Sequence, residues 1–140
     1  MSPSDFPRFV YPVMLDLSAR PCLVVGGGAV AERKVEGLVE AGARVTVVSP
    51  SLTHRLLGLA TDAHFRWRPR EYVAGDAEGF VLVMVATDDM SVNALVAAEC
   101  RERGILIKRS TSEGQLSVID VKQGTRVQMD DIVYVQESWF

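Results

Sequence analysis

The stretch Pro21-Cys-Leu-Val-Val-Gly-Gly-Gly-Ala-Val-Ala-Glu-Arg33 decides the fold of this 140-residue chain. Its first five residues are a short apolar run, which predicts a buried strand. Three glycines follow, and a helical pattern then extends from Ala29 to about Ala41, where Gly42 supplies a stop signal. In that helix Val30, Val35, Leu38 and Val39 share one predicted inner face, and Glu32, Arg33, Lys34 and Glu36 are predicted outside.

Three small residues of this stretch fit the G-x-G-x-x-G/A fingerprint of dinucleotide-binding turns. Gly26 permits a tight turn from strand to helix, and Gly28 lets the backbone approach a pyrophosphate with no Cβ in the way. Ala31 is small enough for close packing of the helix on the strand. The phosphates would bind the N–H groups at the positive end of the helix dipole. A tight turn with a purely structural role is the alternative interpretation.

Composition limits the class of protein. Hydrophobic residues make up 48% of the chain, which suits one globular domain with its own core. The 15 basic and 18 acidic residues argue against broad electrostatic binding of nucleic acid. A local cluster, Arg66, Arg68 and Arg70 with Trp67 interleaved, is interpreted as the polar face of an edge strand, and a local basic patch is the alternative.

Cysteine usage and the absence of export signals predict a cytoplasmic protein. Cys22 and Cys100 lie in apolar patterns without C-x-x-C spacing, and they are expected to be buried, reduced thiols. The N-terminus does not resemble a signal peptide, and the longest apolar run, residues 80–86, is too short to span a bilayer. No metal-ligand cluster is recognisable, so no metal is predicted.

The rest of the chain alternates between strand and helix patterns. Further strands are predicted at 45–48, around 65–67, at 80–86 and at 105–107, and helices at 51–60, with a serine cap, and 91–103. A short helix is possible within 71–79. This order predicts an α/β fold, a Rossmann-like doubly wound parallel sheet with right-handed crossovers. We expect residues 1–108 to form this domain, with residues 9–17 as an extended segment, and residues 109–140 to form a C-terminal β-rich extension.

Ligands of such sheets bind at the carboxyl ends of the strands, which places residues 26–30, 49–51 and 87–88 around one crevice. Thr87 or Asp88 could alternatively serve only to cap the following helix. The second strand ends in Ser49-Pro50, without the acidic residue that often binds the ribose hydroxyls and without an adjacent arginine. The residues alone therefore do not separate NAD from NADP.

Three strings together resemble one family: residues 24–34 (Val-Val-Gly-Gly-Gly-Ala-Val-Ala-Glu-Arg-Lys), residues 41–50, and Ala86-Thr-Asp-Asp89 with Val92-Asn93. This is the precorrin-2 dehydrogenase domain, found alone or at the front of siroheme synthase, and the resemblance covers residues 9–107. It implies NAD-dependent oxidation of the tetrapyrrole precorrin-2 to sirohydrochlorin, followed in some members by insertion of ferrous iron, and it implies a homodimer. The cofactor-binding residues that it implies are Gly26, Gly28, Ala29, Val30, Pro50, Ser51 and Thr87.

The chain departs from the family pattern after its fifth predicted strand. An Asn-Val-x-Asp-type motif stands there in the family, and without gaps it aligns with Lys108-Arg-Ser-Thr111, so that Thr111 takes the place of the proposed catalytic aspartate. Threonine cannot act as a carboxylate base, and the catalytic residue is therefore unknown. The tail, from Gly124 to Val135, resembles the close of a β-grasp module of polysaccharide-export proteins, which suggests a rearranged or fused frame. Two alternatives to the enzyme follow: a non-catalytic dinucleotide-binding module, or an interaction module whose C-terminal strands pair with a partner.

Overall fold

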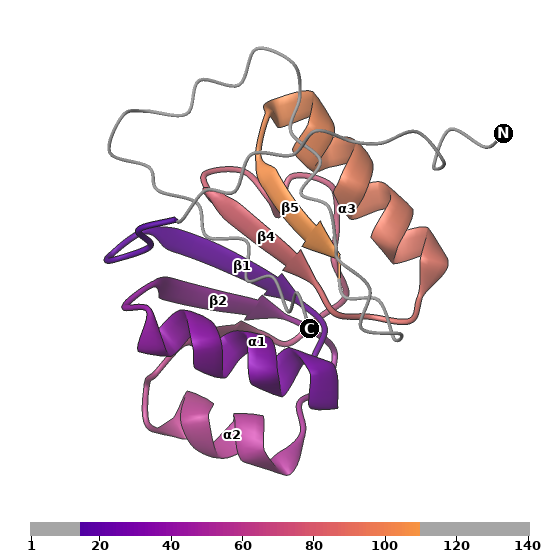
Figure 1. The fold of residues 1–140 in the computed structure, drawn as a ribbon. Coiled ribbons are helices and arrows are strands. Elements are labelled where there is room, and N and C mark those ends of the chain that lie inside the picture. Colours follow the sequence, from indigo (N-terminus) through magenta and orange to yellow (C-terminus); the bar gives the residue numbers. More distant parts are fainter. Residues whose placement is uncertain (1–14, 110–140) are drawn as a thin grey trace, which may run out of the picture. The chain divides into compact units, whose positions relative to one another are not determined.

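A computed structural model describes residues 15–109 of the chain (Figure 1). They form a five-stranded parallel sheet in the order β3-β2-β1-β4-β5. The predicted Rossmann-like doubly wound α/β fold is confirmed. The elements, in chain order, are β1 (Pro21–Val25), α1 (Ala29–Glu40), β2 (Arg44–Val48), α2 (His54–Thr61), β3 (Arg66–Arg68), β4 (Leu82–Val85), α3 (Met90–Arg103) and β5 (Leu106–Arg109).

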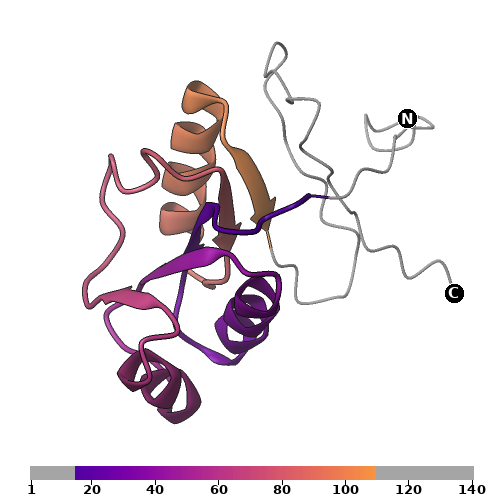
Figure 2. The same ribbon diagram turned by 90° about the vertical axis from the view of Figure 1, so that its left-hand side faces the viewer.

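Helices cover both faces of the sheet. Helix α1 packs on β1 and β2, whereas α3 packs on β4 and β5. Figures 1 and 2 show α1 and α2 on one face and α3 on the other. This division follows from the topology, because right-handed crossovers that run in opposite directions from β1 place their helices on opposite faces. The strand order reverses between β1 and β4, which makes this the switch point of the sheet.

The three central strands, β2, β1 and β4, are buried because the sheet is covered on both sides, which explains their mainly apolar sequences. Leu23, Val25, Val83 and Val85 belong to the same buried cluster as residues of α3, including Cys100. Cys22 and Cys100 are both free and fully buried, and burial raises the pKa of each thiol to about 11. Both side chains therefore serve as small apolar groups in the core.

Helix α2 begins later than the sequence indicates. The serine-capped helix predicted from residue 51 starts at His54, and Thr53 is its cap, with Oγ1 accepting a hydrogen bond from Leu56 N at 3.3 Å. Thr53 N donates to the Gly27 carbonyl at 3.0 Å, and Ser49 Oγ donates to the Ser51 carbonyl at 2.7 Å. These two bonds hold residues 49–53 in a non-helical loop.

The cap of α3 also differs from expectation. Neither Thr87 nor Asp88 caps the helix, because Asp89 does: its Oδ1 accepts from Ser91 N at 3.0 Å and from Val92 N at 3.3 Å. The hydrogen bond from the Ser91 side chain lowers the pKa of Asp89 most, and the hydrogen bond from Val92 N lowers it further. The other end of α3 is closed by Gly104 in the left-handed conformation, as the sequence predicts.

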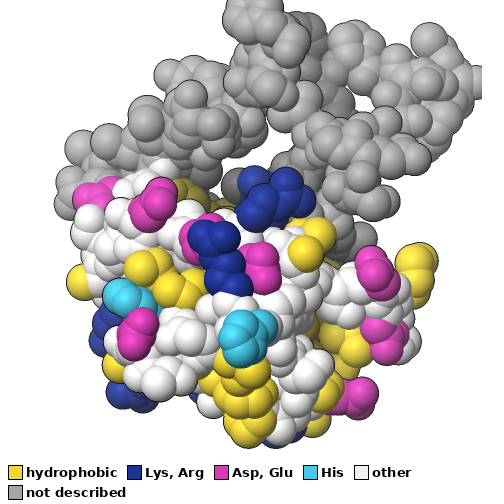
Figure 3. Space-filling view, turned by 90° about the horizontal axis from the view of Figure 1, so that it is seen from below, with side chains coloured by type: hydrophobic (Ala, Val, Ile, Leu, Met, Phe, Trp, Pro, Cys, Tyr) yellow, Lys and Arg dark blue, Asp and Glu magenta, His cyan; other side chains and the backbone are white. Residues whose placement is uncertain are grey.

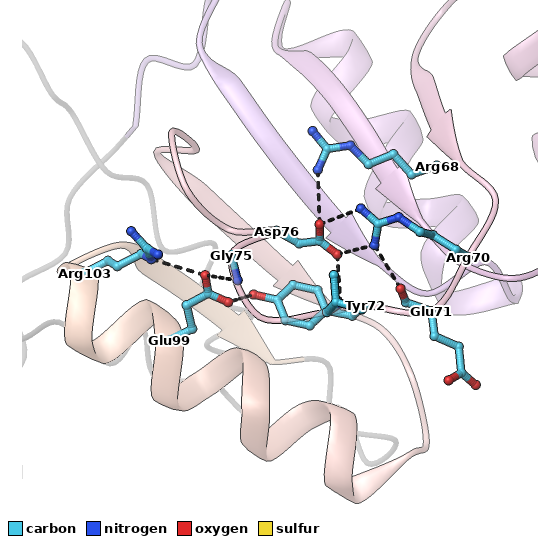
Figure 4. A network of polar contacts seen from close by, with 9 residues as sticks. Arg68, Arg70, Glu71, Tyr72, Gly75, Asp76, Glu99 and Arg103 are labelled. Carbon is cyan, nitrogen blue, oxygen red and sulfur yellow. Dashed lines mark hydrogen bonds and ion pairs between the residues drawn. The ribbon is translucent and has the colours of Figure 1, made fainter.

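The connection from β3 to β4 contains turns and no helix. Two buried carboxylates hold it (Figure 4). Asp76 accepts from the Arg70 guanidinium at 2.6 and 2.7 Å and from Val73 N at 2.9 Å. Glu99 of α3 accepts from the Tyr72 hydroxyl, from Gly75 N at 2.8 Å and from Arg103 Nε at 3.2 Å.

The predicted edge position of β3 is confirmed, since this strand ends the sheet order. On the face that Figure 3 shows, Lys and Arg side chains are interspersed with Asp and Glu rather than gathered into one basic surface. Among residues 15–109, no helix is both long and apolar enough to cross a membrane. Most of the predicted 9–17 segment, and the predicted C-terminal extension beyond Arg109, lie outside the described residues.

Candidate functional site

Three loops meet at the carboxyl ends of β1, β2 and β4. Gly26 N donates to the Val48 carbonyl at 3.0 Å, and Ala86 N donates to the Val25 carbonyl at 2.8 Å. Thr53 N reaches the Gly27 carbonyl, as described above. The glycine loop, residues 26–28, therefore contacts both of its neighbours, residues 49–53 and 86–89. All the cofactor-binding positions expected from the sequence lie on these loops or on the first turn of α1.

The three glycines occupy different environments. Gly26 is buried with φ +123°, and a Cβ there would come within 2.3 Å of the Ala86 carbonyl oxygen. A Cβ on Gly27 would come within 2.1 Å of the Ser51 carbonyl oxygen, a close approach that the fingerprint does not specify. A Cβ on Gly28 would meet no atom of the described residues within 4 Å. The first two glycines thus pack the loops together, and the third faces open space.

The first turn of α1 begins at this open glycine. Gly28 is the N-cap residue, and it has no side chain with which to cap the turn. The first helical hydrogen bond runs from Glu32 N to the Gly28 carbonyl at 3.1 Å, so the N–H groups of residues 29–31 have no acceptor within the helix. Gly28 and Ala29 are exposed, and Val30 is half-buried. Free N–H groups at the positive end of a helix dipole are suited to binding a phosphate.

The loop after β2 presents Pro50 and Ser51, both exposed. Ser49 is buried and cannot serve a ligand, because its hydroxyl donates to the Ser51 carbonyl and its own carbonyl accepts from Trp67 Nε1 at 2.9 Å. Ser49 N donates to the Arg68 carbonyl at 3.2 Å, which brings the end of β3 beside this loop. The groups available to a sugar at this position are therefore the Ser51 hydroxyl and the backbone.

The loop after β4 is held by a side chain of α3. Asn93 Nδ2 donates to the Thr87 carbonyl at 2.9 Å, and Thr87 Oγ1 accepts from Asp89 N at 3.1 Å. Asn93 Oδ1 is buried, and no hydrogen-bond partner for it is found among residues 15–109. The sequence pointed to Asn93 only as part of the family resemblance. Its contact with the Thr87 backbone forms only in the folded chain, so no local sequence pattern indicates this role.

The structure thus brings together the seven cofactor-binding positions expected from the sequence. It leaves the catalytic residue open, because Thr111 lies outside the described residues. Within the described part of the chain there is no group of three His, Cys, Asp or Glu side chains that could hold a metal ion.

Comparison with known proteins gives a consistent family. Residues 13–119 match the family described as "Putative NAD(P)-binding". The siroheme synthase of Methylococcus capsulatus is 47% identical over 94 residues, which cover 67% of this chain and 20% of that protein. The siroheme synthase of Saccharophagus degradans is 37% identical over 108 residues, which cover 77% of this chain and 24% of that protein.

A solved structure, that of SirC, a precorrin-2 dehydrogenase, matches with a TM-score of 0.66 and 27% sequence identity. The match covers 82% of this chain and 62% of SirC. This chain spans only about a fifth of the length of the siroheme synthases that it matches, 20% in the Methylococcus protein. The chain belongs to the NAD(P)-binding family that includes precorrin-2 dehydrogenase and the N-terminal region of siroheme synthases.

Proposed function

We propose that this chain binds NAD and catalyses the NAD-dependent oxidation of precorrin-2 to sirohydrochlorin, a step of siroheme biosynthesis. The observation that carries the proposal is the open Gly28 at the uncapped start of α1. This arrangement fits the diphosphate of a dinucleotide, because backbone N–H groups are available and no side chain of residues 15–109 would obstruct the phosphates at that glycine. The relatives named above support the choice of substrate.

The residues that would hold the cofactor are those expected from the sequence. The N–H groups of Ala29 and Val30 would bind the diphosphate, Pro50 and Ser51 would contact the adenosine side, and the Thr87 backbone would border the nicotinamide side. When bound, the nicotinamide supplies the hydride acceptor. The protein then has to orient the ring, which the rigid contacts of the Thr87 loop with Asn93 support.

NAD rather than NADP is favoured by the arginines near the end of β2. Arg70 donates two hydrogen bonds to Asp76, and the nearest atoms of Arg68 and Asp76 are 3.6 Å apart. Hydrogen bonding to Asp76 raises the pKa of Arg70. Asp76 partly neutralises the charge of both guanidinium groups, which makes this end of β3 less favourable for the 2′-phosphate that distinguishes NADP.

Two measurements on the 140-residue chain test the proposal. Titration calorimetry with NAD and with NADP measures cofactor binding, and we expect tighter binding of NAD. Incubation with precorrin-2 and NAD, followed by absorbance, should show the formation of sirohydrochlorin. Failure to bind either dinucleotide would refute the proposal.

A second candidate function, a dinucleotide-binding module without turnover, is favoured by Thr111 at the position of the family's aspartate. Binding of NAD without the formation of sirohydrochlorin would select this alternative. Light scattering on the same sample tests the homodimer that we also propose. The cytoplasm remains the proposed compartment. Cys22 and Cys100 are both free thiols, which is the state that a reducing compartment maintains.

A further inference from the structure

The side chain of Asn93 has one polar atom with a hydrogen bond and one without. Nδ2 donates to the Thr87 carbonyl at 2.9 Å. Oδ1 is buried, and no hydrogen-bond partner for it is found among residues 15–109. The two atoms cannot exchange places, because an amide oxygen in the position of Nδ2 would face the Thr87 carbonyl oxygen, and neither oxygen can donate. The atom without a partner is therefore an acceptor.

The stability of the fold does not account for this asparagine. A buried acceptor without a donor costs free energy. The other side-chain atom of residues 15–109 in this condition, Glu36 Oε1, forms an ion pair with Arg55, whereas no such group compensates Asn93 Oδ1. Asn93 is also not a cap, because Asp89 caps α3 and its carbonyl accepts from Asn93 N at 3.0 Å. Inside a helix, asparagine is less favourable than leucine.

Asn93 lies beside one of the two loops that flank the glycine loop. Gly26 meets the loop after β4, which contains Thr87, and Gly27 meets the loop after β2. A dinucleotide with its diphosphate at Gly28 would extend one nucleoside toward each of these loops. The loop after β2 is the proposed adenosine side, so the Asn93 amide lies on the nicotinamide side.

We propose that Asn93 Oδ1 accepts a hydrogen bond from the nicotinamide nucleoside of the bound dinucleotide, while Nδ2 keeps its bond to Thr87. The inference rests on the proposed function for the identity of the dinucleotide. Two kinds of group on this nucleoside can donate, the ribose hydroxyls and the carboxamide N–H groups. Because Oδ1 is buried in this structure, the contact requires the loop after β4 to shift when the dinucleotide binds. Residues 88–90 of this segment are all exposed, so none of their side chains is packed in the core and resists such a shift.

Titration calorimetry on the 140-residue chain tests the inference with three probes. These are NAD, ADP-ribose, which lacks the nicotinamide and keeps its ribose, and ADP, which lacks both. Asn93→Leu has a similar shape and no polar atom, whereas Asn93→Asp keeps an acceptor and loses the donor. Thr61→Ala is the matched control, because it removes a bond of the same kind and length on α2, from Thr61 Oγ1 to the Leu57 carbonyl at 2.9 Å.

We expect Asn93→Leu to weaken NAD binding about tenfold, the effect of one lost hydrogen bond, and to leave ADP binding within about twofold of the wild type. In Asn93→Asp the ratio of NAD affinity to ADP affinity should stay within about threefold of the wild-type ratio, because the carboxylate still accepts. Thr61→Ala should bind all three probes as the wild type does. ADP-ribose identifies the donor: a loss that it shares with NAD assigns the ribose hydroxyls, and a loss for NAD alone assigns the carboxamide.

Three results would overturn the inference. The first is unchanged NAD affinity in Asn93→Leu, and the second is an equal loss for ADP. The third is an equal fall of the NAD-to-ADP ratio in Asn93→Leu and Asn93→Asp, which would assign the effect to the bond with Thr87 rather than to Oδ1.

The Tm separates a role in binding from a role in folding. Asn93→Leu loses the bond to Thr87, but it also removes the unpartnered acceptor and favours the helix, so its Tm should stay within about 4 °C of the wild type. A larger fall of the Tm with unchanged NAD affinity would identify a structural asparagine and refute the inference. A wild type that binds no dinucleotide would refute the proposed function and this inference together. Wild-type binding of NAD that Asn93→Leu does not weaken would refute the inference alone.

Discussion

The carbonyl oxygen of Ala86 lies where a side chain on Gly26 would be, since a Cβ on this glycine would come within 2.3 Å of it. The backbone of Gly26, at φ +123°, is also one that residues with a Cβ rarely adopt. The loop after β4 and the glycine loop can therefore meet only through a glycine. Gly28, two residues later, is under neither constraint.

This contrast makes Gly26→Ala and Gly28→Ala a matched pair. We expect Gly26→Ala to lower the free energy of unfolding by about 2–3 kcal/mol, through backbone strain and the clash with Ala86. Gly28→Ala should cost less than about 1 kcal/mol, because only the helix cap becomes less favourable. It should nevertheless weaken NAD binding about tenfold, because its methyl group faces the proposed diphosphate position.

Urea unfolding and NAD calorimetry on both variants check this prediction. If Gly28→Ala lost as much stability as Gly26→Ala, the space around Gly28 would not be open in the folded protein. Unchanged NAD affinity in Gly28→Ala would remove the main support for the proposed cofactor site.

Thr53 and Ser51 give a second matched pair of variants. The sequence predicts a serine cap for this helix, whereas in the structure Thr53 is the cap. Thr53→Ala should destabilise the protein by about 1 kcal/mol, through loss of the bond from Leu56 N to Oγ1. Ser51→Ala should change stability by less than about 0.5 kcal/mol, because its side chain is exposed and does not cap the helix. Thermal unfolding of both variants measures the difference, and a larger loss for Ser51→Ala would restore the cap predicted from the sequence.

The features that the sequence predicts well are those set by local patterns. Continuous apolar runs mark β1, β2 and β4, and the glycine fingerprint marks the turn into α1, because burial and turn geometry act on neighbouring residues. The cap of α2 is not local in this sense. Thr53 takes the role because its N–H bonds to Gly27, and this contact exists only after the β1 and β2 loops have packed together.

Side-chain environments are predicted less well than elements for the same reason. Lys34 falls on the polar face of the α1 pattern and is expected outside, yet it is half-buried, and the charge of Lys108 from distant β5 helps to lower its pKa. Val30 and Val39, expected on the inner face, are only half-buried, and Ala31 is fully buried instead. Periodicity gives the direction of a side chain on its own helix, but the neighbouring elements decide what it meets.

Asp76 should make the stability of the protein sensitive to acid. Hydrogen bonds from Arg70, its largest influence, hold the pKa of this carboxyl below its ordinary value of 3.8. A depressed pKa stabilises the folded state above the ordinary value, and this contribution is lost as the pH falls through the folded-state value. We expect Asp76→Asn to cost about 1–2 kcal/mol at pH 7, a moderate loss because the arginines are partly exposed.

Urea unfolding at pH 7 and at several values below pH 4 measures this effect, and the gap between wild type and Asp76→Asn should narrow in acid. Glu78→Gln is the control. Glu78 is 72% exposed and lies 3.9 Å from Arg103, so its loss should cost less than about 0.5 kcal/mol at any pH. If the difference in free energy of unfolding between wild type and Asp76→Asn were the same at every pH, Asp76 would act through its shape rather than its charge.

Lys34 should give the stability of the protein the opposite dependence on pH. Lys34 has a folded-state pKa below its ordinary value of 10.5, owing to burial and then to Lys108 and Arg33. The folded protein thus binds fewer protons than the unfolded chain between the two values, and its stability rises with pH across that window. The repulsion is present in full below the folded-state pKa of Lys34 and is relieved above it.

Lys108→Gln removes this repulsion, and we therefore expect it to stabilise the protein by about 0.5 kcal/mol at pH 7, a small gain because both groups are partly exposed. The gain should shrink as the pH rises through the lowered folded-state pKa of Lys34, because the wild type then loses the same repulsion. Arg66→Gln, which relieves no such contact, should show no comparable trend. A Lys108→Gln protein less stable than the wild type at pH 7 would contradict this prediction.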